Sequence, residues 1–209
     1  MTICKFSRHL GSGLFCLLIL AYGNGAPADE SARRTNDNQS SPQASMEPSS
    51  DLPNFHEVHP YLYRGGEPTH AGLEKLKELG VKTIIDLRGD SARVQKEREE
   101  ATVLGMTSIN LPMTSRAPTE SQVKTFLEAV ERAADGKGPV FVHCAHGSDR
   151  TGCLVGIFRT SHDGWSYERA YREMRKYYFS PKFTELSGAV GKYARMTERT
   201  SSQQASAPP

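Results

Sequence analysis

The sequence predicts an α/β fold with a mostly parallel central sheet flanked by helices. Short segments rich in β-branched and aromatic residues, such as 140–143, alternate with longer segments that carry helical signals. Thr119 and Gln122 have the spacing of a capping box, which marks the start of a helix. Gly80 and Gly105 follow helical segments, where glycine commonly ends a helix. Because strands and helices alternate, we expect parallel pairing with helices on both faces of the sheet.

The expected elements begin at residue 69. Thr69 caps the first helix, and later helices are recognised by their caps, charged faces and terminal glycines. The strands are recognised as short apolar runs. In chain order we expect a helix at 69–80, a strand at 81–87, a helix at 91–104, a strand at 106–111, a helix at 119–136, a strand at 140–143, a helix at 151–162, a turn near Trp165 and a helix at 167–177.

Composition predicts one folded domain with polar extensions. The 209 residues are 37% hydrophobic, enough for one packed core. Lys and Arg total 26 against 24 Asp and Glu, and no basic tract is present, so no nucleic-acid partner is expected. Residues 27–51 and 197–209 are polar and are expected to form a disordered linker and a disordered tail. The folded domain is therefore expected at 52–196, as a monomer.

Residues 1–26 have the layout of a secretory signal peptide. Lys5 and Arg8 precede an apolar run at 14–22, and small residues follow at 23–26. The run is too short to cross a bilayer comfortably, so no stable membrane span is expected after cleavage. We therefore expect export, to the periplasm or outside the cell; an uncleaved amphipathic N-terminus is the alternative.

The segment 143–152, His-Cys-Ala-His-Gly-Ser-Asp-Arg-Thr-Gly, places a thiol and a guanidinium in one loop. The loop lies between an expected strand and an expected helix, and free N–H groups at a helix N-terminus bind anions. Gly147 and Gly152 allow close approach of the backbone to a phosphate. The residues expected to bind phosphate are Ala145, His146, Gly147, Ser148, Asp149 and Arg150.

The chemistry of this loop assigns three roles. Cys144 is the expected nucleophile, because a helix N-terminus and a nearby arginine favour a thiolate. Arg150 presents a planar fork that matches two phosphoryl oxygens and can hold transition-state charge. Thr151 is expected to hydrogen-bond the sulfur and ease its departure. Because protein groups supply both the nucleophile and the charge, no metal or cofactor is expected.

The pattern His-Cys-(five residues)-Arg-Thr-Gly resembles the phosphate-binding loop of cysteine-dependent protein tyrosine and dual-specificity phosphatases. Residues 61–181 also resemble the atypical dual-specificity phosphatases of bacteria, plants and fungi, at 63–68 (Tyr-Arg-Gly-Gly-Glu-Pro), 84–88 (Ile-Ile-Asp-Leu-Arg) and 111–113 (Leu-Pro-Met). The resemblance implies a phosphatase-like fold with the loop after a central strand, and hydrolysis of a phosphate ester through a phosphocysteine intermediate. It also implies that His143 shapes the loop without touching the substrate.

The expected substrate is a phosphoprotein or a small phosphate ester. Inositol phosphates and phosphoinositides present the same terminal group and are alternatives with the same mechanism. A binding module without turnover is a third possibility, although such a module has no need of Cys144. Sulfur transfer and arsenate reduction fit less well, because rhodanese-like loops do not require Arg-Thr-Gly and small arsenate reductases carry their cysteine near the N-terminus.

The general acid is left open by the sequence. Many relatives place an Asp in the segment that corresponds to 112–118 here, and this segment contains no carboxylate. Asp149 lies in the loop itself, as in myotubularin-like lipid phosphatases, and Glu120 follows the Thr119 cap. Asp149 is the preferred candidate, with Glu120, water or no dedicated acid as alternatives. The non-catalytic interpretations are that Asp149 orients Arg150 or caps the loop and that Glu120 is a favourable charge at a helix start.

Four other residues are weaker candidates. Arg64, Arg88 and Arg116 could bind a second anionic group, but solvated surface positions are expected for them. Cys153 could form a disulfide with Cys144, but the geometric window for such a bridge is narrow. The available histidines and cysteines do not form a convincing metal-ligand set.

Overall fold

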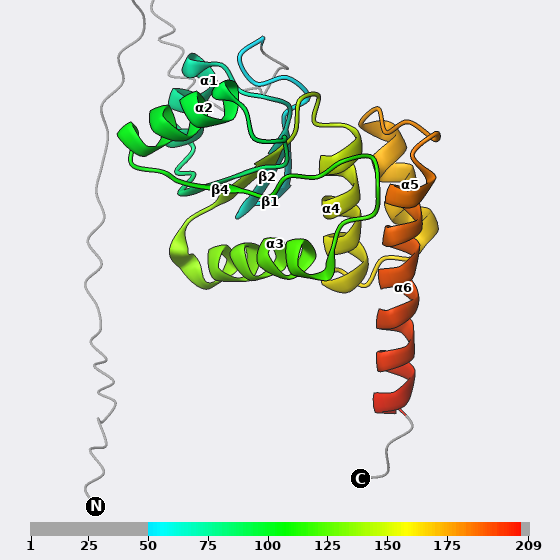
Figure 1. The fold of residues 1–209 in the computed structure, drawn as a ribbon. Helices are drawn as coiled ribbons and strands as arrows, with labels where there is room; N and C mark the ends of the chain where they lie inside the picture. The colour runs from blue at the N-terminus through cyan, green and yellow to red at the C-terminus, as the bar shows by residue number, and fades with distance from the viewer. Residues whose placement is uncertain (1–49, 206–209) are drawn as a thin grey trace, which may run out of the picture. The chain divides into compact units, whose positions relative to one another are not determined.

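The computed structural model describes residues 50–205 and confirms the α/β architecture, with a five-stranded sheet between helices (Figure 1). The strands are β1 (His56–His59), β2 (Leu62–Gly65), β3 (Thr83–Asp86), β4 (Thr107–Asn110) and β5 (Val140–His143). The helices are α1 (His70–Glu78), α2 (Ala92–Val103), α3 (Glu120–Arg132), α4 (Asp149–Ser161), α5 (Tyr167–Lys176) and α6 (Thr184–Ala205), with a π-helical turn, η1 (Ala133–Lys137), after α3.

β5 lies at the centre of the sheet. The strand order is β1-β2-β5-β3-β4, and only β1 pairs in the antiparallel direction. His143 at the end of β5 is opposite both Gly65 of β2 and Asp86 of β3. The carboxyl ends of these three strands therefore meet at one edge, where open α/β sheets bind ligands. The expected position of the loop, after a central strand, is confirmed.

The two faces of the sheet support two separate apolar cores. Phe141 of β5 and Ile84 of β3 pack with residues of α1 and α2. Val142 of β5 and Ile85 of β3 instead face residues of α3, α4, α5 and α6. This alternation is the period-2 pattern of a strand that is buried on both faces, and Figure 1 shows the two groups of helices on opposite sides.

The hairpin formed by β1 and β2 was not predicted. Its segments carry polar or charged residues among the apolar ones, so they lack the continuous apolar run of β5. β2 nevertheless is buried throughout, because β5 pairs with it on one side and β1 covers the other side. Arg64 and the two following glycines thus belong to the sheet and its edge.

Two predicted boundaries are corrected. α4 begins at Asp149 instead of residue 151, so Asp149 and Arg150 lie in its first turn. No helix was predicted after residue 177, yet α6 runs from Thr184 to Ala205, past the domain boundary predicted at 196. The hydroxyls of Thr197, Thr200, Ser201 and Ser202 each donate to the carbonyl four residues earlier.

The N-terminal predictions lie mostly outside the described residues. The expected signal peptide at 1–26 and nearly all of the expected linker at 27–51 fall there. Asp51 already belongs to the fold, since it accepts a hydrogen bond from Thr69 and pairs with Lys75. Among the helices of residues 50–205, none combines the length and apolar character needed to cross a membrane.

Candidate phosphate-binding site

The loop between β5 and α4 is held in a tight conformation by its neighbours. Gly147 has φ +71°, and a Cβ atom there would collide with the backbone of Gly65 and Gly66. At Gly66 a Cβ would lie 3.2 Å from the carbonyl oxygen of Ala145. Glycine is therefore required at 147, because any side chain there would push the loop away from the end of β2, whereas a side chain at 66 would need the neighbouring backbone to shift by a few tenths of an ångström.

Cys144 begins the loop and is 2% exposed. It follows His143 at the carboxyl end of β5 and precedes the first turn of α4, as expected for a nucleophile in this motif. Thr151 is fully buried in α4, and its hydroxyl has no hydrogen-bond partner among residues 50–205. The hydroxyl is thus uncommitted, and its predicted bond to the sulfur stays a prediction.

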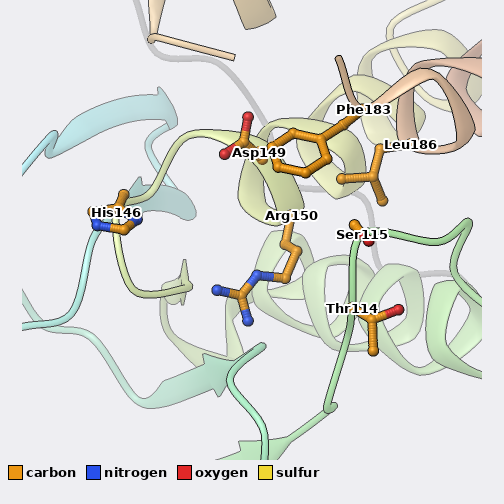
Figure 2. A pocket seen from close by; sticks show the side chains of 7 residues that line it. All are labelled: Thr114, Ser115, His146, Asp149, Arg150, Phe183 and Leu186. Carbon is orange, nitrogen blue, oxygen red and sulfur yellow. The ribbon is translucent and has the colours of Figure 1, made fainter. Parts of the chain in front are cut away.

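A pocket of about 260 Å³ opens beside the loop (Figure 2). The loop and α4 contribute His146, Asp149 and Arg150 to it. The other lining residues, which sequence analysis did not identify, are Thr114, Ser115, Phe183 and Leu186. Thr114 and Ser115 belong to the segment 112–118, where many relatives place the general acid, while Phe183 directly precedes α6 and Leu186 lies in its first turn.

Arg150 extends away from Asp149 and Phe183 in Figure 2. Its Nη1 donates to the carbonyl oxygens of Leu87, at 3.2 Å, and Met113, at 3.4 Å. These backbone contacts use only Nη1 and anchor the guanidinium beside the pocket that Arg150 lines. The fork can then present its remaining N–H groups to a phosphoryl group.

Of the two candidate acids, only Asp149 lies in this pocket. Its Oδ1 accepts a hydrogen bond from the backbone N–H of Ser180 at 2.8 Å, which links the loop to the connection between α5 and α6. Glu120 lies elsewhere: its side chain is 86% exposed and pairs with Lys192 of α6 at 3.2 Å. The geometry therefore keeps Asp149 as a candidate and separates Glu120 from the loop.

A buried ionic cluster lies behind His143. The Nε2 atom of His143 is 2.8 Å from Oε1 of Glu97, and both side chains are buried. Arg88 donates to Asp86 at 2.7 Å and to Glu97 at 2.6 Å. Burial alone would disfavour the charged form of Asp86, but the hydrogen bonds from Arg88 outweigh it and lower the pKa of Asp86 below its ordinary value.

Among the described residues, this cluster is the one group of side chains that could hold a metal ion. Potential ligand atoms of Asp86, Glu97 and His143 lie within 4.8 Å of one another. The guanidinium of Arg88, however, already pairs with both carboxylates. We therefore interpret the cluster as a structural ion-pair network that orients the His143 ring.

The expectation of solvated arginines is wrong for two of the three. Arg64 is fully buried and Arg88 is 8% exposed, whereas Arg116 is exposed as expected. The guanidinium of Arg88 pairs with Glu67, Asp86 and Glu97, which offsets its burial. Arg64 instead makes one hydrogen bond, to the carbonyl of Gly147, and lies against the Tyr177 ring.

Cys153 does not form the disulfide with Cys144 that was considered as a weak possibility. Its thiol donates to the carbonyl of Leu186 at 3.3 Å, and both Cys153 and Cys144 are free in the structure. Burial raises the pKa of Cys153, which keeps it a neutral, unreactive thiol.

Comparison with known proteins agrees with this geometry. A family model described as a DSP-PTPase phosphatase fused to NAD+ kinase matches residues 43–190. Dual specificity protein phosphatase TpbA of Pseudomonas aeruginosa is 29% identical over 123 residues, which cover 59% of this chain and 54% of TpbA. The inositol diphosphatase DSP3 of Arabidopsis thaliana is 29% identical over 125 residues, covering 59% of this chain and 61% of DSP3. The chain thus spans about half the length of TpbA.

Solved structures share the fold at lower identity. A TpbA variant in complex with pTyr aligns with a TM-score of 0.57 and 23% identity, over 69% of this chain and 90% of that one. The catalytic core of the PP-IP phosphatase Siw14 from S. cerevisiae, in complex with citrate, aligns with a TM-score of 0.60 and 24% identity, over 75% of this chain and 96% of that one. Since the family model covers the sheet, the loop from Cys144 to Arg150 and the pocket beside it, the chain belongs to the family of DSP-PTPase phosphatases.

Proposed function

We propose that the chain hydrolyses phosphate monoesters through a phosphocysteine on Cys144. The observation that carries this proposal is the placement of Arg150 in the first turn of α4 and at the wall of a pocket, directly after the loop that begins with the buried Cys144. That arrangement offers a nucleophile, backbone N–H groups at a helix start and a guanidinium to one phosphoryl group.

The proposed reaction has two steps. The Cys144 thiolate attacks phosphorus and forms an S–P bond as the ester P–O bond breaks, with a proton passing to the leaving oxygen. Water then attacks the phosphocysteine and breaks the S–P bond, its proton returns to the group that protonated the leaving oxygen, and inorganic phosphate and the thiolate are released. Arg150 holds the equatorial oxygens in both steps, and Thr151 donates its free hydroxyl to the departing sulfur. Asp149 is the proposed proton donor.

The lining of the pocket favours an aryl phosphate such as phosphotyrosine. Phe183 and Leu186 provide an apolar wall beside the loop, which suits an aromatic ring. Arg150 is the single Lys or Arg among the residues that line this pocket, and Asp149 adds a carboxylate. A substrate with several phosphates, such as an inositol polyphosphate, would lack partners for its additional charges. The pTyr complex of TpbA supports this proposal, whereas the names of DSP3 and Siw14 suggest the alternative substrate class.

Turnover of a phosphotyrosine peptide, an inositol pyrophosphate and nitrophenyl phosphate tests the proposal. We expect release of phosphate from the two aryl esters in the presence of a chelator, inhibition by vanadate, and no turnover by Cys144→Ser. Faster turnover of the inositol pyrophosphate would replace the proposed substrate class. Full activity of Cys144→Ser would reject the phosphocysteine itself. Cys153→Ser is the matched control, because this buried thiol lies outside the loop.

We propose further that the chain acts as a monomer outside the cytoplasm, with the basic and apolar residues of 1–26 as its export signal. Intact-mass measurement of material expressed from Met1 should give a new N-terminus between residues 21 and 28, and light scattering should give the mass of one chain. Cytoplasmic material that retains Met1 would contradict export, and the mass of a dimer would contradict the monomeric state.

A further inference from the structure

Arg64 is a buried cation directly behind the phosphate loop. It is fully buried in β2, and its Nη2 donates to the carbonyl oxygen of Gly147 at 2.7 Å. The guanidinium carbon lies 4.7 Å from the centre of the Tyr177 ring. Its Nε and Nη1 atoms have no hydrogen-bond partner within residues 50–205. A buried charge with so few partners is costly, and such a cost is commonly found where a group serves the site.

The bond to Gly147 belongs to a set of three that hold the loop from behind. A loop that directs its N–H groups toward an anion must direct carbonyls elsewhere, where they need donors. The carbonyl of Ala145 accepts from the backbone N–H of Glu67 at 3.2 Å, and that of His146 accepts from Asn54 at 3.3 Å. Arg64 supplies the third donor, to Gly147, and it is the only charged one of the three.

The charge of Arg64 persists at neutral pH. Burial lowers the pKa of Arg64 to about 10, while Glu173, Tyr177 and Cys144 act to raise it. The titratable and charged groups that face it are Cys144 of the loop, Glu173 and Tyr177 from the region of α5, Arg159 of α4 and His56 of β1. The guanidinium therefore remains a cation in the pH range where a cysteine phosphatase works.

We propose that Arg64 is a positioning residue of the phosphate loop: it fixes the Gly147 carbonyl on the outer side and places a permanent positive charge behind Cys144. Because Arg64 is fully buried, it acts through the loop and does not touch the substrate. This role rests on the proposed function and deepens it, since the same bond both shapes the anion site and favours the thiolate of Cys144.

Alkylation of Cys144 by iodoacetamide, followed across pH and with added inorganic phosphate, tests the proposal without any turnover. In Arg64→Gln we expect the pH midpoint of alkylation to move upward and the phosphate concentration that protects the thiol to rise about tenfold or more, the effect of losing one charged hydrogen bond. In Arg64→Lys we expect the midpoint to stay near that of the unmodified chain, because the charge is kept. Protection by phosphate should still weaken, because the planar fork is lost.

Two controls separate this role from general stability. Arg159→Gln removes a second, largely buried arginine, one that pairs with Asp163 and Glu173 and makes no hydrogen bond to the loop; it should lower the melting temperature and leave protection by phosphate unchanged. Cys144→Ser should abolish the alkylation signal. Folded Arg64→Gln with an unchanged midpoint and unchanged protection would overturn the proposal. If Arg64→Gln does not fold, unchanged phosphate protection in Arg64→Lys overturns it.

The readouts also separate this proposal from the proposed function. A chain that hydrolyses no phosphate ester, yet shows the shift of alkylation midpoint in Arg64→Gln, would retain the role of Arg64 and reject the phosphatase activity. Turnover by the unmodified chain, with alkylation and phosphate protection unchanged in the Arg64 variants, would retain the phosphatase activity and reject the role of Arg64.

Discussion

One nitrogen of the Arg150 guanidinium is bound to the backbone, and this contact determines which of the functions of Arg150 a lysine can perform. Nη1 is bound to the carbonyls of Leu87 and Met113. A lysine keeps the charge, but its single ammonium cannot bind these carbonyls and hold two phosphoryl oxygens in one plane.

We therefore expect Arg150→Lys to lose about 10²-fold or more in kcat for nitrophenyl phosphate, the usual effect of removing one transition-state donor. Thermal unfolding should change little, because Arg150 is not part of either apolar core. Steady-state kinetics and a thermal melt measure both. Near-normal kcat in this variant would show that bidentate contact is not used.

Asp149 differs from Arg150 because its carboxylate has a structural contact as well as a proposed catalytic role. Asp149→Asn can still accept the hydrogen bond from the Ser180 N–H through its amide oxygen, while it cannot supply a proton. The substitution therefore separates the two roles.

If Asp149 protonates the leaving oxygen, Asp149→Asn should lose about 10²-fold on an alkyl phosphate and distinctly less on nitrophenyl phosphate, whose leaving group needs little help. Equal losses on both substrates would assign Asp149 to orientation of the loop. Glu120→Gln is the matched control: it alters an exposed carboxylate paired with Lys192 and should leave both rates unchanged.

At the scale of elements, the capping box that the sequence predicts for α3 is present in the structure. The Thr119 side chain accepts from the Gln122 N–H, and the Gln122 side chain accepts from the Thr119 N–H at 2.8 Å. The Gln122 amide also donates to the carbonyl of Pro112, which ties the start of α3 to the segment that carries Thr114 and Ser115.

Thr119→Ala should lower the free energy of unfolding by about 1 kcal/mol, the usual value of an N-cap. Urea unfolding measures it, and kcat should stay close to normal because the cap is outside the pocket. Thr102→Ala is the control, because this hydroxyl only donates to the carbonyl of Arg98 within α2. A loss as large in Thr102→Ala would argue against a specific capping effect.

Local signals explain which elements were predictable. Capped helices and the continuous apolar β5 appear where the sequence places them, because each carries its signal within a few residues. β2 and the start of α6 carry no such signal: Arg64 interrupts the apolar pattern of β2, and Phe183 meets the loop only through packing. The motif therefore predicts the centre of the candidate site, and tertiary contacts supply its wall and the donors behind it.

At the scale of the whole molecule, the carboxyl edge of the sheet collects buried ionised groups, and this links folding to pH. Asp86 at the end of β3 is 1% exposed, and its pKa is lowered because the hydrogen bonds from Arg88 outweigh the effect of burial. Asp163, after α4, is held in a similar way: burial would raise its pKa, but the hydrogen bonds from Arg159, His162 and His59 together lower it. Both carboxylates thus favour the folded state only while they are ionised.

The sign of the pH effect follows from these lowered values. A carboxylate whose pKa is lower in the folded state contributes stability above its unfolded pKa, about 3.9 for Asp, and this contribution is lost as the pH falls through the folded value. We therefore expect the urea midpoint of unfolding to fall steeply below about pH 4.

Asp86→Asn should lower the midpoint at pH 7, because Arg88 loses a charged partner, and should flatten the decrease below about pH 4. Asp163→Asn should do the same through a separate cluster, so the double variant should show the flattest profile, with effects that add. The exposed Asp135→Asn is the control and should reproduce the unmodified profile. An Asp86→Asn profile parallel to the unmodified one would mean that other carboxylates govern acid unfolding, and a profile that coincides with it at every pH would mean that the ion pair behind His143 contributes no net stability to the fold.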